Sequence, residues 1–190
     1  MVSSASPLAT PIIMGLHKFN TPKRQLRIIQ AFGGAEVTAG ALVMLPTEGF
    51  PNVGSVGRLI PNMEARLVGD DGNDVPQSEN SAGELWLRGP NVMKGYLNNE
   101  AATREAITPD GWLKTGDIAT RDSKGFFRIV DRKKELIKYK GFQVPPAELE
   151  GVLLKHPEVA DSGVIGVIID RLELPRGYIT LKKPTTDAAA

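Results

Sequence analysis

Residues 131–150, DRKKELIKYKGFQVPPAELE, place five basic side chains within nine positions, directly before a predicted helix start. The five are Arg132, Lys133, Lys134, Lys138 and Lys140. Such a cluster is typical either of a solvated surface or of a site that handles phosphate or another anion. The whole chain has 23 basic and 22 acidic residues and a net charge of +1, so this positive charge is local. The overall charge therefore does not indicate nucleic acid or a membrane surface as a partner.

The end of this cluster has residue types that suit contact with an anion. Lys138 and Lys140 alternate around Tyr139, which predicts that they share one face of a strand, with Tyr139 on the opposite face. Two like charges on one face repel each other unless an anion lies there. Gly141 permits a positive φ or a close backbone approach, and Gln143 offers an amide donor and acceptor.

A second group of candidate residues lies on either side of a predicted strand-turn-strand unit. Asp117, in GWLKTGD, follows a glycine in a predicted loop, and its carboxylate can accept from two adjacent sugar hydroxyls. The TGD triplet alone favours the alternative, an Asx-type turn residue. Arg132 follows the next strand and suits ribose or phosphate oxygens, although an isolated arginine is more often a solvated surface residue.

Other kinds of site find little support in the sequence. The chain has no cysteine, so thiolate metal ligands and thiol nucleophiles are excluded. His17 and His156 are its only histidines, and we expect no metal centre. Trp86 and Trp112 are expected to pack between strands rather than to form ligand platforms.

The elements that must position these residues change character along the chain. Residues 26–36, LRIIQAFGGAE, predict a short buried strand running into a Gly-Gly turn, and residues 40–54 predict neither a helix nor a strand pair. In GELWLRG, Leu85 and Leu87 alternate with Trp86 and Arg88, which predicts a strand with two different faces. From residue 53 the sequence predicts short strands at 63–68, 83–89, 112–120 and 126–130, and one asparagine-capped helix at 98–107.

A different pattern follows residue 131. ELIKY and FQV predict a hairpin around Lys140 and Gly141, and Pro146 opens a helix at its first position. In that helix Leu149, Val152 and Leu153 predict an apolar stripe. Residues 159–169 and 177–183 predict two further strands.

Several stretches, in consecutive order, resemble signature blocks of adenylate-forming enzymes. They are NVGSVGRLIPNMEARLV, GELWLRGPNVMKGYLNNEAAT, GWLKTGDIAT and DRKKELIKYKGFQVPPAELEGVLLKHPEVADSGVIG. The wording KYKGFQVPPAELE is most similar to 4-coumarate–CoA ligases and related acyl-CoA synthetases. The resemblance covers about residues 53–184, and the stretch PIIMGL to LRIIQAFGGAE weakly resembles the segment that leads to the acyl-pocket loop.

The resemblance implies a mixed α/β fold made of two incomplete parts. Residues 1–52 would be a remnant of the large N-terminal domain, in its acyl-pocket region. Residues 53–132 would be the strand-rich subdomain of the AMP-binding domain. Residues 133–190 would be the small α+β C-terminal domain, in truncated form.

The resemblance also implies a reaction with two steps. ATP, with Mg²⁺, and a carboxylic acid would give an acyl-adenylate and pyrophosphate, and coenzyme A would then displace AMP to give a thioester. Carried over by motif, Asp117 and Arg132 would bind the nucleotide, and Lys134 would be the hinge of the C-terminal domain. Lys138 and Gln143 would be catalytic residues at the adenylate, and Lys140 and Gly141 would line the coenzyme A tunnel.

Three elements of the family pattern are expected to be missing. They are a Ser/Thr/Gly-rich phosphate loop ending in Pro-Lys-Gly, an aromatic-Gly-x-Thr-Glu motif, and a C-terminal Gly-Lys segment. Thr47-Glu48 lacks the preceding aromatic and glycine, so we interpret it as coincidence, and Lys182 and Lys183 stand in another context. Because stabilisation of phosphate charge is a large part of phosphate-transfer catalysis, we expect a poorly active or inactive enzyme.

Two alternatives to a ligase stay open from the sequence. One is a non-catalytic nucleotide-binding or regulatory fragment that docks to a full-length relative. The other is an adenylation module of a peptide synthetase, which the KYKGFQVPPAELE wording disfavours. With no transmembrane run and no C-terminal targeting signal, we expect a cytoplasmic protein, whereas a full-length relative could be peroxisomal.

Overall fold

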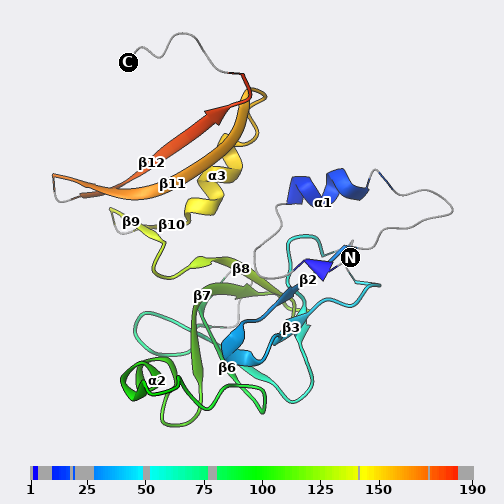
Figure 1. The fold of residues 1–190 in the computed structure, drawn as a ribbon, viewed down its shortest axis with the longest axis vertical. Coiled ribbons are helices and arrows are strands. Elements are labelled where there is room, and N and C mark those ends of the chain that lie inside the picture. Colours follow the sequence, from blue (N-terminus) through cyan, green and yellow to red (C-terminus); the bar gives the residue numbers. More distant parts are fainter. Residues whose placement is uncertain are drawn as a thin grey trace. The chain divides into compact units, whose positions relative to one another are not determined.

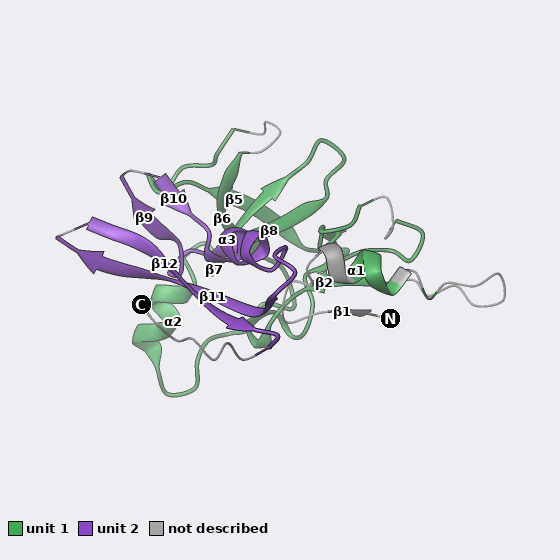
Figure 2. Cartoon of the chain, turned by 90° about the horizontal axis from the view of Figure 1, so that it is seen from above, with its two compact units in different colours: residues 1–130 green, residues 131–190 purple. Residues whose placement is uncertain are grey.

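The structure of this chain is a computed structural model, which describes residues 2–3, 10–17, 19, 28–48, 52–76, 81–140, 142–170 and 172–183. It divides into two compact units, residues 1–130 and residues 131–190 (Figure 2). The fold is mixed α/β and rich in strands, as predicted. The elements are β1 (Val2–Ser3), α1 (Thr10–His17), β2 (Ile29–Phe32), the 3-10 helix η1 (Ala35–Val37), β3 (Leu42–Val43), β4 (Arg58–Leu59), β5 (Glu64–Val68), β6 (Ala82–Arg88), α2 (Glu100–Ala106), β7 (Leu113–Arg121), β8 (Phe127–Arg132), β9 (Ile137–Tyr139), β10 (Phe142–Val144), α3 (Pro146–Leu153), β11 (Val159–Ile169) and β12 (Leu172–Leu181) (Figure 1).

The first unit contains two four-stranded sheets, in the orders β1-β2-β3-β4 and β5-β6-β7-β8. β1 pairs in parallel with β2, whereas β2-β3, β3-β4, β5-β6 and β6-β7 pair antiparallel. The expectation that residues 40–54 form no strand pair was wrong, because Leu42 pairs with both Phe32 and Leu59. These strands are only two residues long, so their sequence carries no alternation from which a strand could be recognised.

The second sheet follows its sequence pattern closely. Leu85 and Leu87 in β6 are fully buried, and Trp86 and Arg88 on the other face are partly exposed, which confirms the predicted two-faced strand. The α2 helix begins at Glu100 rather than at residue 98, but it has the predicted asparagine cap, since the Asn99 side chain accepts a hydrogen bond from the Ala102 N–H at 3.0 Å. Side chains of both sheets share one buried cluster, made of Val37, Ala41, Leu42, Val56, Met63, Leu85, Leu87, Leu113, Ala119 and Phe127.

The backbone of Phe127 joins the second sheet to the segment before β4. The Phe127 N–H donates to the Gly57 carbonyl at 2.8 Å, and the Phe127 carbonyl accepts from the Val56 N–H at 2.9 Å. The same carbonyl accepts from the Ser55 hydroxyl at 2.7 Å, and Ser55 is completely buried. The backbone groups of Phe127, Val56 and Gly57 and the Ser55 hydroxyl therefore have hydrogen-bond partners although they are buried.

A second junction holds the loop after β2. The Asn91 side-chain amide donates to the carbonyls of Val37 at 3.0 Å and of Gly40 at 2.8 Å. The Asn91 backbone carbonyl accepts from the Thr38 hydroxyl at 2.9 Å, and the Met93 N–H donates to the Glu36 backbone carbonyl at 2.7 Å. The segment after β6 thus fixes residues 36–40 by four hydrogen bonds.

The second unit is built around two hairpins and a helix. β9 and β10 pair antiparallel around a two-residue loop, as predicted, and β11 and β12 form a long antiparallel pair. Figure 1 shows α3 lying along β11, and the Glu150 carboxylate accepts from the Val164 N–H at 2.9 Å. α1 and α3 have eight residues each, so none of the described helices could cross a membrane.

The predicted stripe on α3 was only partly right. Pro146 does stand at the first helical position, and Leu149 and Leu153 are half-buried. Leu153 lies over Gly177 of β12. A Cβ atom added at Gly177 would lie 3.1 Å from the Leu153 Cδ1 atom. Val152 is 56% exposed, because α3 turns only one narrow side toward the hairpin.

We predict that Gly57→Ala destabilises the first unit by about 2–5 kcal/mol. Gly57 has φ +94°, and an added methyl group would overlap the Val43 carbonyl. Gly72→Ala is the matched control, since Gly72 has φ +79° and nothing within 4 Å, and it should cost about 1–2 kcal/mol. Urea unfolding followed by tryptophan fluorescence measures both, and equal losses would contradict the crowding at Gly57.

Candidate functional site

Strand β7 bulges away from β6 at the TGD triplet. Glu84 of β6 pairs with Ile118, and Trp86 pairs with Lys114. Three residues of β7, Thr115, Gly116 and Asp117, therefore lie opposite the single residue Leu85. Bulges of this kind re-aim side chains and are frequent beside active sites.

Side chains satisfy the backbone groups that the bulge takes out of the ladder. The Thr115 hydroxyl donates to the Leu85 carbonyl at 2.7 Å and accepts from the Asp117 N–H at 3.1 Å. The Gly116 N–H donates to Oε1 of the buried Glu84 at 3.3 Å. Gly116 has φ +74°, a conformation that favours glycine.

The structure places Asp117 differently from the sequence prediction. Asp117 does not lie in a loop between two strands but inside β7, where it is half-buried. A bulged strand holds a side chain more rigidly than a surface loop does. The arrangement therefore presents a carboxylate from a fixed backbone, which suits recognition of a diol.

The second unit brings two predicted catalytic residues together. Lys138 and Gln143 are directly opposite each other in the β9–β10 hairpin, so their side chains share one face. Both are exposed, whereas Ile137 on the other face is fully buried. The Lys138 N–H turns away from β10 and donates to the Glu173 carboxylate at 2.9 Å. A cation and an amide are thus presented side by side to solvent.

The predicted common face of Lys138 and Lys140 was wrong. Lys140 lies outside β9 in the hairpin turn, with φ +48°. Its Nζ lies 5.2 Å from the centroid of the Tyr139 ring, within the range of a cation–π contact. The turn therefore carries Lys140 to the side of Tyr139 instead of opposite to it. Gly141, the other residue predicted to line the coenzyme A tunnel, lies outside the described residues.

The remaining basic residues lie at the start of the second unit. Arg132 is the last residue of β8, and its carbonyl accepts from the N–H groups of Glu135 at 2.9 Å and Leu136 at 3.2 Å. Lys134, the predicted hinge, is exposed in this turn. The Asp131 carboxylate accepts from the Ala147 N–H at 3.3 Å, in the first turn of α3, where the helix dipole favours a negative charge.

The tryptophans pack against strands and cations. Trp112 is buried, and the guanidinium carbons of Arg66 and Arg88 lie 5.2 and 4.5 Å from its ring centroid. Lys114 covers the Trp86 ring at 5.5 Å. The rings are therefore part of the packing, as the sequence predicts, and are not open stacking platforms.

The sequence prediction overlooked residues 32–36. Phe32, Gly33 and Glu36 match the aromatic, the glycine and the glutamate of the aromatic-Gly-x-Thr-Glu pattern, with Ala35 at the threonine position. The Glu36 carboxylate accepts a hydrogen bond from the Tyr96 hydroxyl at 3.1 Å. Partial desolvation of the hydroxyl and this bond to Glu36 raise the pKa of Tyr96, although the residue is 40% exposed. Alanine in place of threonine at the fourth position is what separates this stretch from the strict motif.

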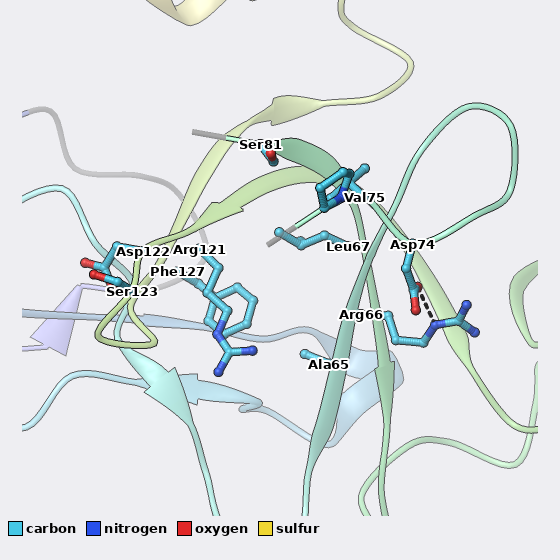
Figure 3. A pocket seen from close by; sticks show the side chains of 11 residues that line it. Ala65, Arg66, Leu67, Asp74, Val75, Ser81, Arg121, Asp122, Ser123 and Phe127 are labelled. Atoms are coloured by element: carbon cyan, nitrogen blue, oxygen red, sulfur yellow. Dashed lines mark hydrogen bonds and ion pairs between the residues drawn. The ribbon is translucent and has the colours of Figure 1, made fainter. Parts of the chain in front are cut away.

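A cavity of about 320 Å³ lies in the first unit, between β5, residues 74–76 and the β7–β8 turn (Figure 3). Arg66 on one side is paired with Asp74 at 2.7 Å, and Arg121 on another lies over the Phe127 ring at 5.5 Å. None of the residues predicted as site residues lines this cavity. The predicted site residues lie instead in the β7 bulge of the first unit and, separately, in the β9–β10 hairpin and the preceding turn.

The described residues contain no group of three or more His, Cys, Asp or Glu side chains that could hold a metal ion.

A family model for AMP-binding enzymes matches residues 1–97, about half of the chain. The chain belongs to the AMP-binding enzyme family. Its sequence relatives and structural neighbours agree with this membership.

Among curated relatives of this AMP-binding chain, the 4-coumarate–CoA ligase-like 4 of Oryza sativa is 46% identical over 96% of the chain. The probable 4-coumarate–CoA ligase 1 of Dictyostelium discoideum is 48% identical over 85% of it. The matches cover 33% and 29% of these relatives, so the chain spans about a third of their length.

Solved structures of adenylate-forming enzymes share the fold. O-succinylbenzoate coenzyme A synthetase of Bacillus subtilis, in complex with ATP and magnesium, matches 98% of the chain with a TM-score of 0.82 and 32% identity. An anthranilate CoA ligase in complex with anthranoyl-AMP matches 98% with a TM-score of 0.83 and 27% identity. The match covers 37% and 35% of those chains, respectively.

We predict that Thr115→Val destabilises the first unit by about 1–3 kcal/mol, because it leaves the Leu85 carbonyl and the Asp117 N–H without their hydroxyl partner. Thr115→Ser keeps the hydroxyl and should stay within about 1 kcal/mol of wild type. Urea unfolding measures the stability, and hydrogen exchange at the Asp117 amide measures the local opening. Slow exchange of that amide in Thr115→Val would contradict the role of the hydroxyl.

Proposed function

We propose that this chain is part of an acid–thiol ligase, which activates a carboxylic acid with ATP and transfers the acyl group to coenzyme A. The carboxylate would attack the α-phosphorus of ATP, giving an acyl-adenylate and pyrophosphate. The coenzyme A sulfur would then attack the acyl carbon, releasing AMP and the thiol proton. Membership of the AMP-binding family and the names of the 4-coumarate–CoA ligase-like relatives support this proposal.

The presentation of Asp117 by the β7 bulge is the observation that carries the proposal. One carboxylate has enough acceptor sites to receive hydrogen bonds from both hydroxyls of a ribose. Its backbone is held by Thr115 and Glu84, so little freedom is lost when the nucleotide binds. Asp117 is therefore assigned to the ribose, with Arg132 as a second nucleotide-binding residue.

The β9–β10 hairpin is assigned to the reacting groups. Lys138 and Gln143 would contact the adenylate, the lysine as a cation beside the phosphate and the glutamine as a hydrogen-bonding amide. Their position on one face of the hairpin supports a shared ligand. Lys140 and Gly141 would line the path of coenzyme A, and Lys134 would be the hinge between the two reaction steps.

Magnesium belongs to this proposal as part of the ATP substrate. Mg²⁺ is usually held by one or two carboxylates together with substrate phosphates, and not by a dedicated protein cluster. We therefore place the ion on the phosphates of ATP and name no residue of this chain as its ligand.

We also propose the domains to which the residues belong, the location of the protein and a partner. Residues 1–52 and 53–132 are assigned to the large domain of the family, and residues 133–190 to its small C-terminal domain. A cytoplasmic location and docking to a full-length relative are part of the proposal.

We predict that AMP binds the chain with a Kd of about 1 mM or weaker, because two charge-assisted hydrogen bonds of about 1.5–3 kcal/mol each must offset the entropy of association. Asp117→Ala should abolish this binding, because it removes both ribose acceptors together. Glu105→Ala removes a carboxylate from the exposed face of α2 and should bind as wild type does. NMR titration decides this, and equal shifts in wild type and Asp117→Ala would overturn the ribose assignment.

We predict little or no acid-dependent pyrophosphate release by this chain alone, since its sequence carries no Pro-Lys-Gly phosphate loop. The assay uses a panel of aryl and fatty acids with ATP and magnesium, and a full-length 4-coumarate–CoA ligase is the positive control. Robust turnover would refute this prediction. AMP binding without turnover would favour a non-catalytic nucleotide-binding fragment.

A further inference from the structure

Glu84 is a buried acid with a specific place in the bulge. It is 8% exposed, and it stands in β6 at the last regular pair before the bulge, opposite Ile118. Its Oε1 accepts the Gly116 N–H at 3.3 Å. By contrast, Glu64 at the sheet edge is more than half exposed and forms an ion pair with Arg88.

The contact between Glu84 and Gly116 holds the backbone that leads into Asp117. The Gly116 N–H belongs to the peptide plane between residues 115 and 116, and the Asp117 N–H belongs to the next plane. Glu84 holds the first plane, and the Thr115 hydroxyl holds the second at 3.1 Å. The Cα–Cβ direction of Asp117 follows from the plane that Thr115 holds and from the plane after it. Glu84 holds the plane on the other side of Gly116, so it limits the rotation about Gly116 and acts on Asp117 from one residue upstream.

The length of the Glu84 side chain suits this task. In a regular ladder the Gly116 N–H would find a backbone carbonyl, but the bulge places three residues opposite Leu85 alone. The Leu85 carbonyl already accepts the Thr115 hydroxyl at 2.7 Å. A side-chain oxygen from the neighbouring residue of β6 supplies the acceptor instead.

We infer that Glu84 is a positioning residue, which acts through Gly116 to aim the Asp117 carboxylate at the ribose. The inference rests on the proposed assignment of Asp117 to nucleotide binding. What Glu84 contributes is the reach of its acceptor oxygen and not its charge. This separates it from Asp117, whose charge meets the ligand.

Two variants separate reach from charge. Glu84→Gln keeps an acceptor oxygen at the same reach and removes the charge. Glu84→Asp keeps the charge and withdraws the oxygen by one methylene group. Both are small changes, and a cooperative urea transition is required of each before binding is measured.

The test combines NMR titration with AMP and hydrogen exchange at the Gly116 amide. We expect Glu84→Gln to bind AMP within about twofold of wild type and to keep the Gly116 amide protected. Glu84→Asp should weaken AMP binding at least about fivefold and speed exchange of that amide. Wild-type affinity and slow exchange in Glu84→Asp would overturn the inference, and so would equal losses in both variants.

The outcome also separates this inference from the proposed function. If wild type binds AMP, Asp117→Ala does not, and Glu84→Asp does, the ribose assignment stands and the role of Glu84 falls. If wild type itself does not bind AMP, the ribose assignment falls with the role of Glu84 in it. In that case the Gly116 exchange rates still show whether Glu84 holds the bulge.

Discussion

The first unit depends on a crossing of backbone between its two sheets, where Phe127 pairs with Gly57 and its carbonyl receives both the Val56 N–H and the Ser55 hydroxyl. This crossing joins two sheets whose strands are otherwise paired only among themselves. It is buried, so its hydrogen bonds have no water to compete with them. Phe127 also begins β8, and β8 is the neighbour of the bulged strand β7. The stability of the candidate site is thus tied to a contact far from it in sequence.

The bulge needs few special contacts to form within this sheet. Two side chains, Thr115 and Glu84, satisfy three backbone groups, and only one residue, Gly116, has a positive φ. The rest of this sheet keeps a regular two-faced pattern, with Leu85, Leu87 and Leu113 in the buried cluster. The Asp117 carboxylate is thus presented with little disturbance of the packing around it.

The elements with local signals were predictable from the sequence. The Asn99 cap, the Leu85/Leu87 alternation and Pro146 each act within a few residues, and each predicted its element correctly. β3 and β4 were missed because two-residue strands are defined by their partners and not by their own pattern. The bulge was missed for the same reason, since the surplus of residues in β7 exists only in relation to β6. Lys140 and Val152 departed from their patterns because a turn and a narrow helix contact overrode the local periodicity.

Lys138 and Gln143 lie on one face of the hairpin because the loop between β9 and β10 has two residues. Side chains alternate along a strand, so adding one residue to the loop would shift the register by one and send one member of the pair to the opposite face. Substitutions within the loop leave that count unchanged. Relatives that keep these two side chains on one face should therefore tolerate exchanges of residue type at the loop more readily than a single insertion or deletion there.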